Sequence, residues 1–191
     1  THHPVDPDGR FAADCGFLGN RLPDREARVE EFFLHPAALL PDKQFVLGGS
    51  GWGDKPMPAN VKYVGHVYTR DHNAFNCTAR TVLNINRSSM ARYGFSPATR
   101  VFEAAGAGAC MITDAWEGIE LFLEPDEEVL VAHNGGDVAQ LLQGLTPERA
   151  RRVGRAARAH VLAEHTYRHR AEQVVKILDA KTVQQKVRVA A

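Results

Sequence analysis

Short apolar runs alternate with longer amphipathic stretches along most of the chain. Six of these runs are typical of buried strands, and they are residues 15–19, 43–49, 61–67, 81–86, 109–113 and 128–132. The stretches between them carry apolar residues at helical spacing. This alternation predicts an α/β fold: a Rossmann-like, three-layer domain in which a mostly parallel sheet of about six strands is flanked by helices.

The helices are predicted from their starting signals as well as from their periodicity. Proline-containing signals for a cap and first turn stand at residues 23–24, 96–97 and 146–147. The polar residues 87–95 are predicted to form a loop. Further helices are expected over residues 71–79, 137–145, 146–164 and 167–178, with a short one after the turn at 114–118.

The chain divides into a domain and two flanks. Residues 1–12 are rich in Pro and Asp and are interpreted as a linker from an N-terminal domain, residues 13–178 as the Rossmann-like domain, and residues 179–191 as a C-terminal tail that frays or docks elsewhere. The absence of an initiator Met favours a fragment of a longer protein.

The overall composition limits the classes of function that are expected. The 23 Lys and Arg residues balance the 23 Asp and Glu residues, so the chain has no net charge that would attract it to nucleic acid or an anionic membrane. The arginines of residues 148–158 are best explained as the solvent-exposed face of a predicted helix. Three isolated cysteines and no apolar run of about 20 residues favour a protein of the reducing cytoplasm without a membrane span.

Polar groups that suit an anion follow several of the predicted strands. In a doubly wound sheet, ligands bind beyond the carboxyl ends of the strands. The predicted anion-binding groups are Gly19, Asn20 and Arg21 with the nearby Arg25, then Arg87, and then the backbone amides of Gly118 and Ile119.

Arg100 and Glu103 stand on one face of a predicted helix, three residues apart. Their neighbours are small or apolar, so this helix is expected to be packed. A half-buried carboxylate needs a partner. The alternatives are an ordinary surface ion pair with Arg100 and a ligand whose vicinal hydroxyl groups, like those of ribose, donate to Glu103.

Four blocks resemble a known family: F-L-G-N, L-N-I-N-R, R-V-F-E-A-A-G-A-G-A-C-M-I-T-D and E-G-I-E-L-F-L-E-P-D-E-E-V-L-V. In this order they are similar to the C-terminal half of CgeB-type (spore maturation protein B-like) glycosyltransferases, relatives of the family 4 enzymes of the two-domain GT-B architecture. The resemblance extends over roughly residues 11–178.

The resemblance implies a domain that binds a nucleotide-diphosphate sugar, the donor substrate, without a further cofactor. Two glutamates eight positions apart flank the donor in family 4. Glu103 matches the second, which holds the ribose, whereas Phe95 stands where the first is expected. By the same likeness, the loop after Gly19, Arg87, Arg100 and the amides near Gly118 surround the diphosphate, and His66 lies near the base.

The likeness also implies a second half. The N-terminal Rossmann domain of a GT-B enzyme supplies the acceptor site, so this chain is expected to bind nucleotide weakly and to transfer no sugar alone. The acceptor is unknown, and no residue is assigned a catalytic role. A non-catalytic nucleotide-binding or scaffold module with a degenerate transferase fold is the alternative, and a nucleotide-sugar 2-epimerase is a third.

No metal is predicted. Asp6-Pro7-Asp8 has the D-x-D spelling of metal-dependent transferases but lies in the proline-rich lead-in. His160, His165 and His169 lack a closed zinc spacing, so solvated helix faces explain them better. The run G-G-S-G-W-G also fails as a dinucleotide loop, because prolines follow it in place of a helix.

Overall fold

A computed structural model describes the backbone of residues 2–189 and the side chains of residues 2–179, and its centre is a six-stranded sheet. The strand order is β3-β2-β1-β4-β5-β6, and every neighbouring pair is parallel. The predicted α/β, Rossmann-like fold is therefore confirmed. The strands are β1 Cys15–Leu18, β2 Phe45–Gly48, β3 Val61–Tyr63, β4 Thr81–Asn84, β5 Met111–Asp114 and β6 Leu130–Ala132.

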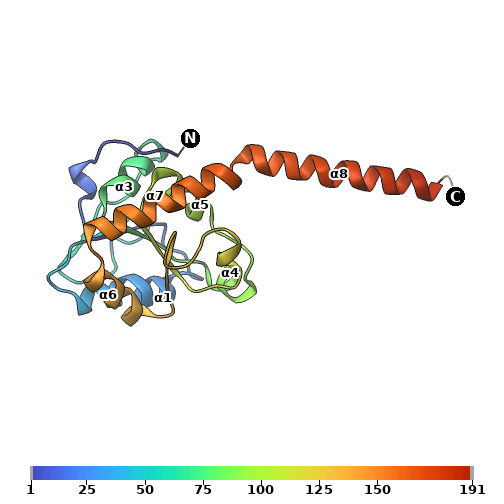
Figure 1. Ribbon diagram of the computed structural model, residues 1–191. Helices are drawn as coiled ribbons and strands as arrows, with labels where there is room; N and C mark the ends of the chain where they lie inside the picture. The colour runs from blue at the N-terminus through green and yellow to red at the C-terminus, as the bar shows by residue number, and fades with distance from the viewer. Residues whose placement is uncertain (1, 190–191) are drawn as a thin grey trace.

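Helices cover both faces of the sheet (Figure 1). The helical elements, including short 3-10 turns and one π turn labelled η, are η1 Gly9–Phe11, α1 Glu26–Val29, η2 Glu30–Leu34, α2 His35–Leu39, η3 Thr69–Asp71, α3 His72–Thr78, α4 Ser88–Tyr93, α5 Thr99–Ala107, η4 Ile119–Leu121, α6 Gly135–Gly144, α7 Pro147–Glu164 and α8 Tyr167–Val189. Elements α1 to α2 and α6 lie on one side, and α3, α5 and α7 on the other.

Alternate strand residues feed two separate cores, because successive side chains of a strand point to opposite faces. Phe17 and Phe45 belong to the core beneath α1, η2 and α6, where Phe33 packs between their rings. Leu18 and Val46, one position further along the same strands, belong to the core beneath α3, α5 and α7. Burial on both faces explains why these strands read as continuous apolar runs.

Two local predictions were wrong. Residues 88–93 form α4 and not a loop, since the Ser88 N–H and Oγ both donate to the Asp24 carbonyl oxygen and Gly94, with φ of 64°, ends the helix. The next helix, α5, begins at Thr99 with Ala98 at its N-cap, so Ser96 does not cap it. The reason is that Phe95 donates its N–H to the Glu117 carbonyl oxygen at 2.6 Å, which extends the turn before the helix.

The strand order places one side of the sheet at a topological switch point. The chain proceeds outward from β1 to β3, and then crosses to β4 on the other side of β1. The loops after β1 and β4 consequently diverge, and in doubly wound folds this is the position where ligands bind. Five of the predicted site segments follow the ends of β3, β1, β4 and β5 or lie on α5, so the fold gathers them at this edge.

Helix α8 projects from the domain (Figure 1). It extends to Val189, beyond the predicted end near residue 178, while residues 190–191 and the side chains from 180 onward lie outside the described residues, where the predicted docking of the tail would fall. Its described apolar side chains at Tyr167, Val174 and Leu178 are all more than half exposed. Among the helices described here, none has the length and hydropathy needed to cross a membrane.

Candidate functional site

The loops after β1, β2 and β3 are joined by hydrogen bonds at the carboxyl edge of the sheet. The Ser50 N–H donates to Asn20 Oδ1 at 2.9 Å, and the Arg21 N–H donates to the Ser50 carbonyl oxygen at the same distance. Ser50 Oγ lies 3.4 Å from His66 Nδ1. The structure thus brings together three residues that were predicted separately, Asn20, Arg21 and His66.

His66 belongs to an exposed aromatic pair. Its ring meets that of Tyr68 edge to face, with centroids 4.7 Å apart, and the Tyr68 side chain is 61% exposed. The Arg70 guanidinium lies 5.6 Å from the centre of the Tyr68 ring. Such rings offer flat surfaces for stacking. The sequence pattern did not mark Tyr68 as a site residue, because Tyr68 directly follows a run predicted to be a strand.

Arg21 is fully engaged by carboxylates. Its Nε and Nη2 donate to Glu26 at 2.8 and 2.7 Å, and its Nη1 donates to Asp54 at 3.0 Å. Lys55 also contacts Glu26, at 2.9 Å. Hydrogen bonds from Arg21 and then from Lys55 lower the pKa of Glu26 to about 2, and the same bond with Glu26 raises the pKa of Arg21. The predicted anion contact of Arg21 stays a prediction, but its charge already has partners.

Gly19 makes room for a different arginine. A Cβ atom at this position would lie 2.8 Å from Arg25 Nη1 and 2.9 Å from Phe17 Cζ, both too close for a real side chain. The Arg25 guanidinium therefore lies against the bare backbone at the end of β1. Its Nε is buried without a hydrogen-bond partner, and no described residue forms an ion pair with it.

Arg25 lies close enough to Arg100 to affect its pKa. Burial lowers the pKa of Arg100 to about 10; Glu103 opposes this fall, and Arg25 contributes to it. Burial and then Arg87 lower the pKa of Arg25, while Asp24 and Asp114 oppose that fall. Arg87 itself holds Asp24 at 2.6 Å, whereas no described carboxylate comes within ion-pair distance of Arg25 or Arg100. Their combined field is suited to an anion with more than one charge.

Glu103 lies one turn along α5 from Arg100. Its side chain is 25% exposed, and its described ion-pair partner is His2 Nε2 at 4.0 Å rather than Arg100. The alternative of an ordinary surface ion pair between Arg100 and Glu103 is therefore not formed, although the carboxylate raises the pKa of Arg100 through space. Both oxygens of Glu103 have no described hydrogen bond, so they are available to hydroxyl donors.

The turn at Gly118 is covered by Phe95. Gly118 has φ of 98° and is buried, and a Cβ there would lie 2.6 Å from Phe95 Cδ1. Phe95 itself has φ of 49°, uncommon for a large side chain. Ile119 opens only a three-residue 3-10 turn. The amides of Gly118 and Ile119 consequently sit behind an aromatic ring, and their predicted contact with an anion stays a prediction.

Asp114 is a buried carboxylate that links residues at the carboxyl edge of the sheet. Asp114, at the end of β5, is fully buried, and Arg28 Nη2 donates to its Oδ2 at 2.5 Å. The Asn86 N–H donates to both carboxylate oxygens, at 3.1 and 3.2 Å. Burial raises the pKa of Asp114, and the bond from Arg28 opposes that rise. The sequence did not single out this pair, because the two residues are 86 positions apart.

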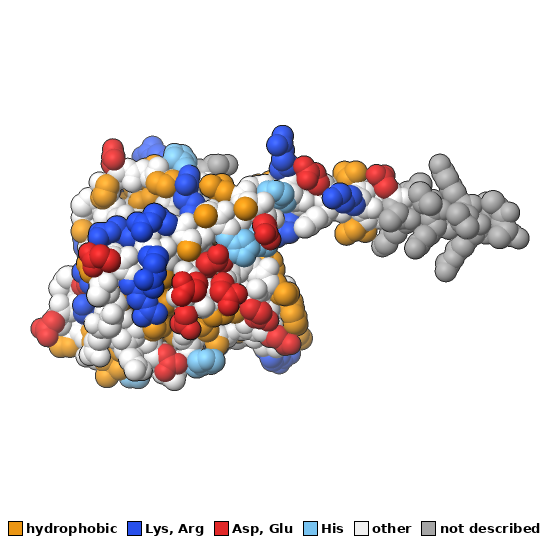
Figure 2. Space-filling view, in the orientation of Figure 1, with side chains coloured by type: hydrophobic (Ala, Val, Ile, Leu, Met, Phe, Trp, Pro, Cys, Tyr) orange, Lys and Arg blue, Asp and Glu red, His pale blue; other side chains and the backbone are white. Residues whose placement is uncertain are grey.

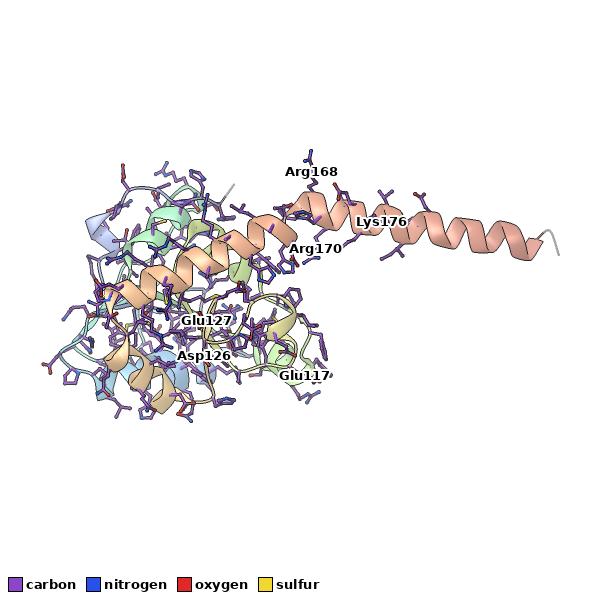
Figure 3. All side chains as sticks on the ribbon, viewed as in Figure 1. Glu117, Asp126, Glu127, Arg168, Arg170 and Lys176 are labelled. Carbon is purple, nitrogen blue, oxygen red and sulfur yellow. The ribbon has the colours of Figure 1, made fainter. Side chains whose placement is uncertain are left out.

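Two adjoining clefts open beyond β4, β5 and β6. One has a volume of about 420 Å³ and is lined by Arg28, Ser88, Arg92 and His133 among others. The second, of about 660 Å³, shares His133 with it and extends along Glu117 to Asp126. Glu117, Asp126 and Glu127 mark the acidic side of this region in Figure 3. Both clefts lie beside the loops after β4, β5 and β6, and neither is lined by Arg25 or Arg100.

A sequence profile of a family described as glycosyl transferase-like matches residues 25–176 of the chain. The match covers Arg25, Arg100, Glu103 and the turn at Gly118, whereas Gly19, Asn20 and Arg21 lie before its first residue. No curated protein matches the chain at a significant level.

Solved structures show where the fold recurs. Sucrose-phosphate synthase from Thermosynechococcus elongatus has a TM-score of 0.71 and 16% identity, over 96% of this chain and 50% of its own. Anabaena HepE, solved with UDP-glucose, has a TM-score of 0.66 and 12% identity, over 87% and 48%. The C-terminal domain of the group 1 glycosyl transferase LpcC from Francisella tularensis has 0.64 and 13%, over 86% and 96%.

These identities establish the fold alone. The lengths are informative, however: this chain spans about half of the first two neighbours, and it spans nearly all of a separately solved C-terminal domain. The Rossmann-like fold expected from the resemblance is therefore confirmed, whereas the second half of a GT-B enzyme stays a prediction.

Proposed function

This chain belongs to the glycosyl transferase-like family, and on that premise we propose that it is the domain that binds a nucleotide-diphosphate sugar for transfer to an acceptor. The observation that carries the proposal is the pair of unpaired arginines, Arg25 and Arg100, at the switch point of the sheet. Like charges held together inside a fold cost free energy unless a ligand compensates them.

The diphosphate is the group that fits these arginines. Each guanidinium can donate two parallel hydrogen bonds to a phosphate. Arg87 lies close enough to add a third cation, provided that its bond with Asp24 opens. The uncapped first turn of α5 begins directly before Arg100 and adds the partial positive charge of a helix N-terminus. Arg25 thereby takes the role first assigned to Arg21.

The remaining parts of the donor would extend from the diphosphate in two directions. Glu103 would accept hydrogen bonds from the two ribose hydroxyl groups. The base would lie towards His66 and Tyr68, whose loops are joined to Asn20 through Ser50. The transferred sugar would point towards the clefts lined by Arg28, Arg92 and His133.

We assign the acceptor site and any catalytic base to a second domain that faces this edge. The neighbours that are about twice as long support a two-domain enzyme. The four sequence blocks support the CgeB-type subgroup within the family. On this proposal the 191-residue chain binds the donor but transfers no sugar alone, and sugar release above the buffer rate would contradict that part.

The first experiment is a calorimetric titration of this chain with UDP, GDP and TDP and with the corresponding sugar nucleotides. UDP is the first ligand to try, because HepE was solved with UDP-glucose. Glu103→Ala is expected to weaken binding by about tenfold, the order of one hydrogen bond to a charged group.

The control is Arg151→Ala, which removes an exposed arginine on α7. It should leave the affinity unchanged. Equal binding by the wild-type chain and Glu103→Ala would remove the ribose contact from the proposal. No binding of any nucleotide at millimolar concentration would favour the scaffold alternative.

One observation favours that alternative. Phe95 stands in the position of a sugar-contacting glutamate and packs its ring on Gly118. A ring there offers the donor no hydrogen bond. Phe95→Glu tests this observation with a sugar nucleotide: tighter binding than by the wild-type chain would mean that a glutamate here reaches the sugar, as a transferase site requires, whereas unchanged affinity would favour the non-catalytic alternative.

A further inference from the structure

Histidine and acidic side chains meet where α7 gives way to α8, and none of them belongs to the proposed donor site. Figure 2 shows pale blue and red side chains side by side at this corner. His160, Glu164 and His165 each place one nitrogen or oxygen atom within 4.8 Å of the others. Sequence spacing favoured solvated helix faces for these histidines, but the end of α7 gathers them.

His160 is oriented as a metal ligand is. Its Nδ1 donates to Glu128 Oε2 at 2.6 Å, and this bond leaves Nε2 facing Glu164 Oε2 at 3.7 Å. A histidine that binds a metal commonly donates its other ring N–H to a carboxylate, which fixes the ring and the tautomer. Glu128 reaches His160 from the segment before β6, so the orientation does not depend on α7 alone.

His165 adds a second imidazole with an unused atom. Its Nε2 is buried, and no described residue provides a hydrogen-bond partner for it. The ring lies 5.1 Å from that of His160. His165 also stands at the C-cap of α7, where the partial negative charge of the helix end favours a cation.

Arg170 now supplies the positive charge at this corner. Its Nη2 contacts His165 Nδ1, and its Nη1 donates to Gln173 at 2.8 Å. Figure 3 shows Arg170 at the base of α8, next to the end of α7. Because Arg170 can only donate, His165 Nδ1 accepts from it and the proton of the neutral imidazole lies on Nε2. A divalent cation bound at Nε2 requires that proton to move to Nδ1, which can then no longer accept from Arg170, so binding would displace the guanidinium.

We propose that His160, Glu164 and His165 form a site for Zn²⁺, with Glu128 holding His160 in place and with Arg170 giving way when the ion binds. Tetrahedral zinc has ligand bonds of about 2.1 Å, which puts ligand atoms roughly 3.4 Å apart. The 3.7 Å between His160 and Glu164 is already close to this, and the exposed Glu164 side chain is free to adjust. Three protein ligands leave one position for water.

The ion would fix the corner between α7 and α8. His160 and Glu164 belong to α7, while His165 lies in the turn before α8 and Glu128 belongs to the body of the domain. The site therefore connects all three parts. Zinc binding is expected to set the direction in which α8 leaves the domain.

The test is a calorimetric titration of the metal-stripped chain with Zn²⁺. We expect one ion per chain, and each of His160→Ala and His165→Ala should weaken binding at least tenfold. Glu128→Gln should weaken it about tenfold, as loss of an orienting carboxylate does. Arg170→Ala should tighten it severalfold, because a repelling charge is removed.

The double variant His2→Ala/His3→Ala is the control for adventitious binding by neighbouring histidines, and circular dichroism checks that each variant folds. Loss of zinc binding in this control, or unchanged binding in His160→Ala and His165→Ala, overturns the proposal. Weaker binding in Arg170→Ala overturns the exchange of Arg170 for the ion. Slower hydrogen exchange over residues 161–170 with zinc would support the fixed corner, and unchanged exchange would contradict it.

Discussion

Three arginines within eight residues have different surroundings. Arg21 forms ion pairs with Glu26 and Asp54, and Arg28 forms one with Asp114. Arg25 lies between them in the sequence, yet it has no described ion-pair partner and faces Arg100. We call Arg21 and Arg28 the paired arginines, and Arg25 and Arg100 the unpaired arginines.

The difference separates stability from binding. The charge of a paired arginine is used within the fold, where it holds a loop or a strand end. The charge of an unpaired arginine is kept at a cost and is available to a ligand. Variants of the two kinds should therefore fail in different assays, the first in unfolding and the second in nucleotide binding.

The largest effect is expected for Asp114→Ala. This change leaves Arg28 without its carboxylate and the Asn86 N–H without an acceptor in a buried setting. Breaking a buried pair in this way costs about 3–5 kcal/mol. Urea unfolding measures it. Asp54→Ala, which removes an exposed partner of Arg21, should cost far less, because solvent screens an exposed ion pair; equal losses in both variants would remove the distinction between buried and exposed partners.

Arg100→Ala should have the largest effect on binding. Loss of a charged hydrogen bond of about 1.5–3 kcal/mol weakens UDP binding by roughly 10- to 100-fold. The free energy of unfolding should not fall, because removing a buried charge relieves its desolvation cost, the largest influence on the pKa of Arg100. Arg21→Ala is the matched variant, with little change in UDP affinity. The comparison breaks down if Arg21→Ala weakens UDP binding as much as Arg100→Ala does.

Gly19→Ala tests how Arg25 is positioned. The added methyl group would meet Arg25 Nη1 at 2.8 Å and push the guanidinium away from the end of β1. We expect about fivefold weaker UDP binding, near 1 kcal/mol, since the charge remains but its geometry changes. Calorimetry gives the affinity. In the background Arg25→Ala the same substitution should have no further effect, and an additive loss would show that Gly19 acts independently.

The smallest effect concerns the pH dependence of the loop held by Arg21. The pKa of Glu26 falls from an ordinary value of 4.5 to about 2 because Arg21 and Lys55 donate to it. Its stabilisation is therefore complete above about pH 4.5 and is lost as the pH falls towards 2. Urea unfolding at pH 7, 5 and 3 should show a steeper loss for the wild-type chain than for Glu26→Gln. Parallel curves would mean that the ion pairs with Glu26 do not persist in solution.

The candidate site shows which functional residues can be identified from local sequence patterns. Gly19, Arg87 and Arg100 could be named because each lies at the mouth of a strand or in the first turn of a helix, and mouths of parallel strands share one edge. Tyr68 and the pair of Arg28 and Asp114 could not be named. Their roles depend on contacts between segments far apart in the sequence, which no periodicity records.

Helix α4 likewise depends on a contact between segments that are far apart in the sequence. Its six residues, S-S-M-A-R-Y, are too few to show an apolar stripe at helical spacing, and the polar residues around them favour a loop there. The helix forms because Asp24, 64 positions earlier, accepts hydrogen bonds from Ser88 at its first turn. The early expectation that α5 starts at Ser96 was wrong for a similar reason, the tertiary bond between Phe95 and Glu117.

By itself, the sequence determined where the six strands lie and that the fold is α/β, because the apolar runs and their alternation with helical stretches depend on residue type and spacing. Only the tertiary structure decided which arginines have partners. Ion pairing depends on distances of a few ångströms between side chains from different elements, and it is these distances that leave Arg25 and Arg100 unpaired while Arg21 and Arg28 are neutralised.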